Sequence, residues 1–426
     1  MKKNVLILGS GGREHALAYK IKQSNLIAQL FVMPGNPGTA ALALNLPGNP
    51  SDAELVKTTI FNFDIDIVIC GPEVPLADGL MDALSIASWD HKPILVGPTK
   101  AGAMLESSKA FSKEFMLKHS IPTAAFQAFT KDQEQEALEY MSLLKPPIVL
   151  KASGLAAGKG VIISPDHHQA ELELLDLLHG KFGAASETIV IEEFLDGIEF
   201  SVFILTNGTQ YALLPIAKDY KRIGIADSGL NTGGMGAVSP VSFVDEILLE
   251  KVRSQIIQKT LDGLKKDQIP YQGFIFFGLI CVQGEPYLIE YNCRMGDPET
   301  EVVMPRLKTD LIELILAMQE NRLDQVKIET DPRYAATIML VSGGYPGVYE
   351  KGKTIQLPTE GYQNSILFHA GTKEQNNILT TDGGRVISIT SFGNTKEEAV
   401  DTSLDLAAKI QFEGKYYRQD IGFDLS

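Results

Sequence analysis

The first 105 residues alternate between short apolar runs and more polar stretches. Apolar runs at 3–8, 30–33, 65–70 and 94–96 have the pattern of buried strands. The stretch after the first run is expected to form a helix over about 16–23. Strands that alternate with helices predict a doubly wound α/β domain with a parallel sheet.

Each of these strands leads into a loop rich in glycine or proline. Such loops meet at one edge of a parallel sheet, where α/β domains bind ligands, and the N-terminus of the helix expected over about 16–23 is suited to an anion. The dinucleotide fingerprint is incomplete because Glu14 stands where its third glycine would be. A phosphate-bearing small substrate therefore fits better than NAD. Glu73 is the one charged side chain of its loop, and it is either a substrate contact or a solvated turn residue.

A strand, a glycine-rich loop and a second strand are predicted over 147–163. Glycines let backbone N–H groups approach phosphate oxygens, and lysines add positive charge, so this hairpin can fold over a polyphosphate. It is not a Walker A loop, which needs four residues between its glycines and a helix after its lysine. The alternative is an ordinary mobile hairpin with a basic tip. The candidate residues are three glycines and two lysines: Lys151, Gly154, Gly158, Lys159 and Gly160.

Two further groups of candidates flank this hairpin. A helix over 107–119 carries Lys109, and a strand over 188–191 ends in Glu192, Glu193 and Leu195, whose backbone can meet an adenine edge. Residues 215–240 are predicted to form a long irregular loop, and loops of that length are usually functional. That loop contains Asp219, Asn231, Gly234 and Met235.

A β-hairpin is predicted over 273–292, and its second strand carries polar side chains. Glu290 and Asn292 project from one face of that strand because strand side chains alternate. Two oxygen ligands two residues apart suit Mg²⁺, although the pattern alone is a weak signal. The strand runs directly into a dense polar turn that contains Arg294, Pro298, Glu299 and Thr300.

A third domain, rich in β-strands, is predicted from about residue 331. Its expected strands are at 334–340, 365–369 and 384–390, and its expected helix is over 395–410. The predicted domains are therefore 1–105, 106–330 with a smaller module at about 123–192, and 331–426.

Composition narrows the possible partners. The chain has 426 residues and a net charge of −15, without a basic stripe, so nucleic acid is not an expected partner. Its three cysteines are far apart and form no Cys-x-x-Cys, which fits a reducing cytoplasm better than a zinc site or a disulfide framework. No signal peptide and no membrane-spanning apolar stretch is evident, so a cytoplasmic location away from membranes is expected.

Nine sequence motifs, in the order in which they occur along the chain, resemble those of the ATP-grasp ligases. Within that superfamily they resemble the phosphoribosylamine–glycine ligase family. The resemblance covers essentially the whole chain, and the Asn-Thr-Gly-Gly-Met-Gly segment and the run at 292–300 are specific to this family. The motifs lie at 9–16, 34–39, 71–73, 108–111, 151–160, 192–197, 231–236, 292–300 and 368–372.

The resemblance implies a pre-ATP-grasp N-terminal domain, a two-part α+β ATP-grasp core with a mobile lid, and a small β-rich C-terminal domain. It implies ligation of glycine to 5-phosphoribosylamine with ATP and Mg²⁺ or Mn²⁺, through glycyl phosphate, by a monomer or dimer. The implied catalytic residues are Arg294, Lys151 and Asp219, and the implied metal ligands are Glu290 and Asn292. The implied ATP contacts are Lys109, Lys151, Gly154, Gly158, Lys159, Gly160, Glu192, Glu193, Leu195 and Glu199. The implied substrate contacts are Gly11, Asn36, Glu73, Asp219, Asn231, Gly234, Met235, Arg294, Pro298, Glu299 and Thr300.

Three residues depart from the family pattern. Leu230 and Met295, which replace the usual proline and phenylalanine, are interpreted as packing changes. Tyr220 replaces a histidine and bears on how the 219–222 segment contacts substrate. Two other functions compete with the ligase: a carboxylase-type ATP-grasp enzyme that acts on aminoimidazole ribonucleotide, and a nucleotide sensor without turnover.

Overall fold

The N-terminal region forms the predicted parallel α/β domain. A computed structural model of the chain describes residues 2–156, 160–360 and 362–425. The first sheet has the order β3-β2-β1-β4-β5, and all its neighbouring strands are parallel. Its strands are β1 (Lys3–Gly9), β2 (Ile27–Pro34), β3 (Leu44–Asn45), β4 (Ile67–Cys70) and β5 (Ile94–Val96). Its helices are α1 (Gly12–Lys22), α2 (Pro37–Ala40), α3 (Ala53–Asn62), α4 (Glu73–Asp78) and α5 (Leu80–Ile86).

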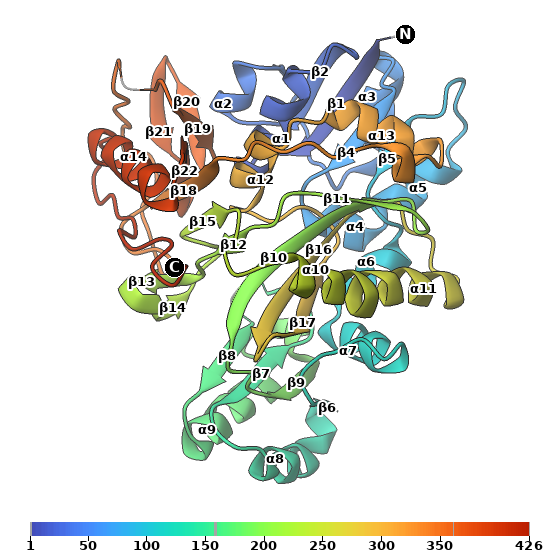
Figure 1. The fold of residues 1–426 in the computed structure, drawn as a ribbon, viewed down its shortest axis with the longest axis vertical. Coiled ribbons are helices and arrows are strands. Elements are labelled where there is room, and N and C mark those ends of the chain that lie inside the picture. The colour runs from blue at the N-terminus through green and yellow to red at the C-terminus, as the bar shows by residue number, and fades with distance from the viewer. Residues whose placement is uncertain (1, 157–159, 361, 426) are drawn as a thin grey trace.

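A four-stranded antiparallel sheet occupies the middle of the molecule (Figure 1). Its order is β11-β10-β16-β17, from β10 (Ile198–Thr206), β11 (Tyr211–Leu213), β16 (Gly273–Val282) and β17 (Glu285–Asn292). The segment predicted as one helix over 107–119 is interrupted at Ser108, whose side chain caps the second helix by accepting the Phe111 N–H at 3.3 Å. The surrounding helices are α6 (Lys100–Ser107), α7 (Lys109–Lys118), α10 (Glu246–Val252), α11 (Gln258–Lys266), α12 (Thr300–Arg306) and α13 (Leu311–Gln319).

Residues 123–193 form the predicted small α/β module, at the opposite end of the molecule from the first domain (Figure 1). Its sheet has the order β6-β9-β7-β8, and its apolar side chains form a separate core. The strands are β6 (Phe126–Thr130), β7 (Ile148–Ala152), β8 (Val161–Ser164) and β9 (Thr188–Glu193), and the helices are α8 (Glu134–Leu143) and α9 (His167–Leu178). Antiparallel pairing of β7 with β8 confirms the predicted hairpin.

The last sheet has the order β12-β15-β18-β22-β19 and draws two strands from the middle of the chain. Residues 215–240 were predicted as an irregular loop, and that prediction is wrong. Strands of two to four residues are too short to show a pattern. The strand β15 also pairs with a distant part of the chain, because Val238 lies opposite Ala336. The strands of this region are β12 (Lys218–Asp219), β13 (Arg222–Gly224), β14 (Ser228–Asn231), β15 (Gly236–Ser239), β18 (Tyr334–Val341), β19 (Ser365–His369), β20 (Thr372–Gln375), β21 (Ile378–Thr381) and β22 (Arg385–Gly393), with α14 (Lys396–Lys409). Within the described residues, no helix combines the length and the apolarity that crossing a membrane requires.

Candidate functional site

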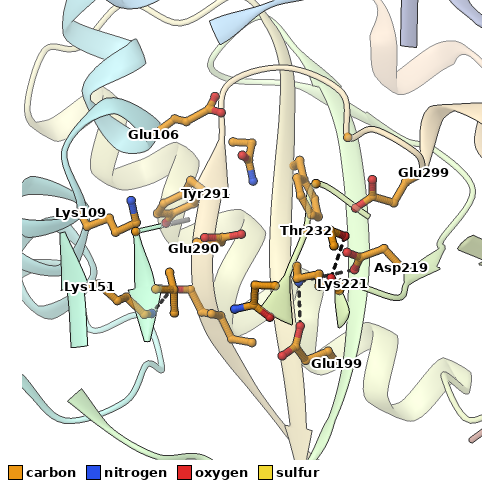
Figure 2. Close-up of a pocket in the computed structure, with 18 of the residues that line it drawn as sticks. Glu106, Lys109, Lys151, Glu199, Asp219, Lys221, Thr232, Glu290, Tyr291 and Glu299 are labelled. Atoms are coloured by element: carbon orange, nitrogen blue, oxygen red, sulfur yellow. Dashed lines mark hydrogen bonds and ion pairs between the residues drawn. The ribbon is translucent and has the colours of Figure 1, made fainter. Parts of the chain in front are cut away.

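A cavity of about 740 Å³ is lined by residues of all the regions described above. Figure 2 shows two lysines on one side, a cluster of acidic residues with Lys221 on the other, and Glu290 between them. The cavity therefore has a mainly basic end and a mainly acidic end. The sheets that approach it are far apart in the sequence, so no single segment shows the site.

The basic end is organised around one buried carboxylate. Glu192 of β9 lies 3 % exposed, and its Oε2 atom is 2.9 Å from Lys151 Nζ and 3.0 Å from Lys113 Nζ. Lys113, on α7, also donates to the Thr123 hydroxyl at 2.7 Å. Burial lowers the pKa of Lys113 to about 8, against the opposing effect of Glu192. The lysines thus join α7 to the sheet of the small module.

Lys109 lies at the start of α7, next to the glycine-rich hairpin. Its backbone N–H donates to Ser153 O at 2.9 Å, and its Nζ is 3.4 Å from Gly154 O. Burial lowers the pKa of Lys109, because the nearby carboxylates do not fully offset the cost of burying its positive charge. An anionic ligand would supply the missing negative charge. Of the predicted hairpin contacts, Gly160 lines the cavity, whereas Gly158 and Lys159 lie outside the described residues.

Glu290 and Asn292, near the end of β17, both line the cavity. The buried Asn292 amide nitrogen has no hydrogen-bond partner among the described residues, so this carboxamide is available to a ligand. A carboxylate and a carboxamide are oxygen donors of the kind that Mg²⁺ takes from proteins. Two protein oxygens fit a metal that takes its other ligands from substrate and water. Among the described residues, no three or more His, Cys, Asp or Glu side chains are grouped so that they could hold a metal ion.

At the acidic end, one lysine lies between two carboxylates. Lys221 Nζ is 2.8 Å from Glu199 Oε2 and 3.5 Å from Asp219 Oδ1. The neighbouring carboxylates overcome the effect of burial and raise the pKa of Lys221 well above its usual value. Burial raises the pKa of Asp219, which lies on β12. Figure 2 shows Glu299 on the same side of the cavity, and burial together with Asp219 raises its pKa to about 7.

Arg294 follows β17 and is held by two carboxylates. Its Nη2 lies 2.7 Å from Glu106 Oε1, and its Nε lies 3.5 Å from Glu73 Oε2. Glu106 also accepts the Cys293 N–H at 2.7 Å. Burial raises the pKa of Glu73, but Arg294 and Arg13 outweigh it and the net shift is downward, so this carboxyl group is ionised at neutral pH.

Arg385 brings the last sheet to the same cavity. From β22, its Nη1 donates to Gly233 O at 2.6 Å and to Asp297 O at 2.7 Å, and its Nη2 lies 2.8 Å from Asp297 Oδ1. The side chain therefore joins two segments that the sequence singled out, the 231–236 loop and the 292–300 turn.

The structure brings together some of the predicted site residues at the cavity and places others behind it. The predicted residues that line it are Glu73, Lys109, Lys151, Gly160, Glu192, Glu199, Asp219, Asn231, Glu290, Asn292, Arg294 and Glu299. Those that do not line it are Gly11, Asn36, Gly154, Glu193, Leu195, Gly234, Met235, Pro298 and Thr300.

Several residues behind the cavity make contacts that shape its walls. Asn36 Nδ2 donates to Ser10 O and to His369 O, each at 2.8 Å, and so joins the first domain to the last. Gly234 has a φ of +120°, and a Cβ there would lie 2.3 Å from the Pro298 side chain. Only glycine allows this close approach of the two loops.

Residue-by-residue reasoning missed several charged side chains of the cavity. Four of them lie in segments already singled out and could have been assigned from their charge: Arg13, Lys221, Arg222 and Asp297. The others have no local sequence pattern that marks them, and only the fold brings them to the site: Glu106, Lys113, Lys218, Asp227, Arg385 and Asp424.

The three departures from the family pattern have different environments. Met295 is 1 % exposed and packs in an apolar core, as a packing change requires. Leu230 is 66 % exposed, so the packing interpretation is wrong for this residue: its side chain points away from any core. Tyr220 is buried, and its hydroxyl donates to Asp424 Oδ1 at 2.7 Å.

Comparison with known proteins agrees with this architecture. Three family models, described as the N domain, the ATP-grasp (A) domain and the C domain of phosphoribosylglycinamide synthetase, match residues 3–106, 107–300 and 335–424. The division at 105/106 and 330/331 stays a prediction.

Individual relatives match over nearly the whole chain. A phosphoribosylamine–glycine ligase of Vibrio vulnificus is 44% identical over 99% of this chain and 98% of its own length. The bifunctional purine biosynthetic protein PUR2,5 of Pichia angusta is 43% identical over 99% of this chain, which spans 53% of that longer protein. The crystal structure of the Thermotoga maritima phosphoribosylamine–glycine ligase superposes with a TM-score of 0.83 at 35% identity, covering 98% of this chain and 100% of that one. The chain belongs to the phosphoribosylglycinamide synthetase family, whose other name is the phosphoribosylamine–glycine ligase family.

Proposed function

We propose that the chain catalyses the ATP-dependent ligation of glycine to 5-phosphoribosylamine, which gives glycinamide ribonucleotide, ADP and phosphate in the second step of de novo purine biosynthesis. The observation that carries the proposal is one cavity in a chain that matches all three domain models of the family. Lysines suited to phosphates lie at one end of this cavity, and Glu290 lies between them and a carboxylate-rich end suited to amines (Figure 2).

The reaction proceeds in two displacements. A carboxylate oxygen of glycine attacks the γ-phosphorus of ATP, the bond from that phosphorus to the ADP oxygen breaks, and glycyl phosphate forms. The amine of phosphoribosylamine then attacks the carbonyl carbon, the C–N bond forms and phosphate leaves. Both steps depend on positioning and on neutralising charge, and no enzyme nucleophile is needed.

The ATP end is assigned to the small module and α7. The strand end from Glu192 to Leu195 binds adenine through its backbone, and Glu199 binds the ribose. The hairpin and Lys109, Lys151 and Lys159 bind the phosphates. The ion pair between Lys151 and Glu192 supports the role assigned to Lys151, because it fixes the ammonium group at the cavity wall. Closure of the hairpin module as a lid would exclude water, which hydrolyses acyl phosphates.

Glu290 and Asn292 would hold a Mg²⁺ or Mn²⁺ ion beside Lys109. When bound, such an ion neutralises the phosphate charge that develops during transfer. Burial lowers the pKa of Lys109 while Glu290 opposes this shift, which supports placing the lysine and the pair on the same phosphates.

The amino substrates are assigned to the other end of the cavity. Asp219 and the 231–236 loop bind the ammonium group of glycine, and Arg294 binds its carboxylate and the acyl phosphate. The loops at Gly11 and Asn36, with Glu73 and residues 298–300, bind phosphoribosylamine. Glu299 takes the proton that the attacking amine loses, because a pKa of about 7 suits a general base at neutral pH. We further propose a cytoplasmic enzyme that is a monomer or a dimer.

The test is ADP release with ATP, Mg²⁺, glycine and phosphoribosylamine formed in place from ribose 5-phosphate and ammonia. We expect ADP only when both amino substrates are present, and loss of activity in Glu290→Ala. The matched control is Glu285→Ala, on the same strand, whose exposed side chain pairs with Lys251 outside the cavity. ADP release without glycine, with bicarbonate and aminoimidazole ribonucleotide instead, would support the carboxylase. ATP binding without turnover in any mixture would support the sensor.

A further inference from the structure

The 416–425 segment packs against the β13–β14 hairpin, which adjoins the acidic end of the cavity. Arg418 in this segment is fully buried. Its Nε and Nη2 each lie 2.8 Å from a carboxylate oxygen of Asp420. Its Nη1 lies 2.6 Å from Asp227 Oδ1 and donates to Arg222 O at 3.1 Å. The segment is therefore fixed to the hairpin by the charged contacts of a buried arginine.

Asp424, in the same segment, reaches the cavity itself. Its Oδ1 accepts the Tyr220 hydroxyl at 2.7 Å, and its Oδ2 lies 3.2 Å from Lys218 Nζ. Burial and Asp424 raise the pKa of Tyr220, so the hydroxyl keeps its proton and donates it to this bond. Tyr220 and Lys218 are the two sequence neighbours of Asp219, and one carboxylate holds both of them.

The backbone of Tyr220, whose side chain is held by Asp424, is hydrogen-bonded to the 231–236 loop. Its N–H donates to Gly236 O at 3.0 Å, and its carbonyl oxygen accepts the Met235 N–H at 2.7 Å. The next carbonyl, of Lys221, accepts both the N–H and the hydroxyl of Thr232 at 2.8 Å. The loop thus takes its position from the 220–221 backbone.

We propose that Asp424 is a positioning residue for the glycine wall of the cavity, through Tyr220 and Lys218. The inference rests on the proposed function, in which Asp219 and the 231–236 loop bind glycine. Asp424 has two effects. Its hydrogen bond fixes Tyr220 and therefore the loop. Its charge compensates the buried Lys218 ammonium, which otherwise attracts Asp219 and competes with the ammonium group of glycine.

The test compares Asp424→Asn and Tyr220→Phe with Asp405→Asn, a control on the exposed face of α14. We expect Asp424→Asn to raise the KM for glycine about tenfold, because that is the effect of losing about one charge-assisted hydrogen bond. We expect the KM for ATP to stay within about twofold, because the lysines and strand end assigned to ATP make none of these contacts. Tyr220→Phe, which keeps the Lys218–Asp424 pair, should show a smaller rise, and Asp424→Glu should restore part of the loss.

A second measurement does not depend on activity. Amide hydrogen exchange of residues 219–236 should be at least about tenfold faster in Asp424→Asn than in Asp405→Asn, at equal thermal stability. Unchanged exchange in this segment would overturn the inference whatever the enzyme assay shows. An equal rise in both KM values would also overturn it, because that result indicates a general structural role. Loss of the glycine requirement in the unmodified protein would instead refute the proposed function.

Discussion

Replacement of Glu192 by glutamine tests how the small module is joined to the rest of the protein. The amide oxygen of glutamine can take the place of Oε2 between the two lysines, because the other carboxylate oxygen has no hydrogen-bond partner among the described residues. The substitution therefore removes charge and leaves the shape of the contact almost unchanged. Its effect on the free energy of unfolding therefore measures how much the buried ion pairs of Glu192 with Lys113 and Lys151 stabilise the module.

The expected loss of stability in Glu192→Gln has two parts. Lys113 has a pKa of about 8 beside Glu192, and the loss of the carboxylate lowers this pKa further. Lys113 then loses its proton at pH 7, which costs about 1.4 kcal/mol for the one pKa unit between 8 and 7. Lys151 loses a charge-assisted hydrogen bond at 2.9 Å, a loss of about 1.5–3 kcal/mol. Together these give about 3–4 kcal/mol, within the range of about 3–5 kcal/mol for breaking a buried ion pair.

The pH dependence of this difference has a fixed sign. In the wild type, Lys113 takes up its proton in the folded state as pH falls below about 8, whereas the variant does so only at lower pH. The folded wild type therefore gains stability relative to the variant as pH falls through 8. Above pH 8 the folded Lys113 is neutral in both proteins. The Lys113 part of the difference, about 1.4 kcal/mol at pH 7, should disappear at pH 9.

Amide hydrogen exchange of β7 and β9 measures this stability directly. Fluorescence of the single tryptophan, Trp89, reports on the first domain instead. Glu193→Gln is the matched control, because the Glu193 side chain accepts the Ala125 N–H at 2.8 Å and its charge raises the pKa of Lys113 less than the charge of Glu192 does. A loss of protection in Glu192→Gln within about 1 kcal/mol of this control at pH 7, or a loss that grows at pH 9, would refute the reasoning.

Two further outcomes follow from the charged groups of the cavity. Glu106→Gln keeps an oxygen that can accept the Cys293 N–H but removes the charge beside Arg294, so kcat/KM should fall about 10–100-fold. An unchanged kcat/KM would show that Glu106 does not position Arg294. The raised pKa of Glu299, about 7, should appear as a fall in kcat/KM below pH 7 as this base is protonated. That inflection should be missing in Glu299→Gln, and its persistence there would assign the titration to another group.

Much of the fold was predictable because its longer strands carry their own signal. The apolar runs of β1 and β16, seven and ten residues long, are almost entirely buried, so local sequence identifies them. The segment from β12 to β15 was not predictable in this way. Its strands are two to four residues long, and β15, to which β12 pairs, is held in the sheet by β18, about a hundred residues later.

The same distinction applies to the site. Glu290 and Asn292 were found because both lie on one face of a single strand. Arg385 and Asp424 come from sequence more than 80 residues beyond the turn and the loop that they contact, so only the tertiary structure shows their role. The family resemblance implied a substrate contact for Asn36, but it could not show that the Asn36 amide joins two domains.

The central claim, that glycine is activated as glycyl phosphate in this cavity, is tested most directly by an oxygen label. Glycine labelled with ¹⁸O in both carboxylate oxygens is turned over with ATP and phosphoribosylamine, and the released phosphate is analysed by mass spectrometry. The account predicts one ¹⁸O atom in each phosphate, because the attacking carboxylate oxygen leaves with phosphorus, and one ¹⁸O atom in the amide of the product. Unlabelled phosphate formed together with glycinamide ribonucleotide would contradict the account.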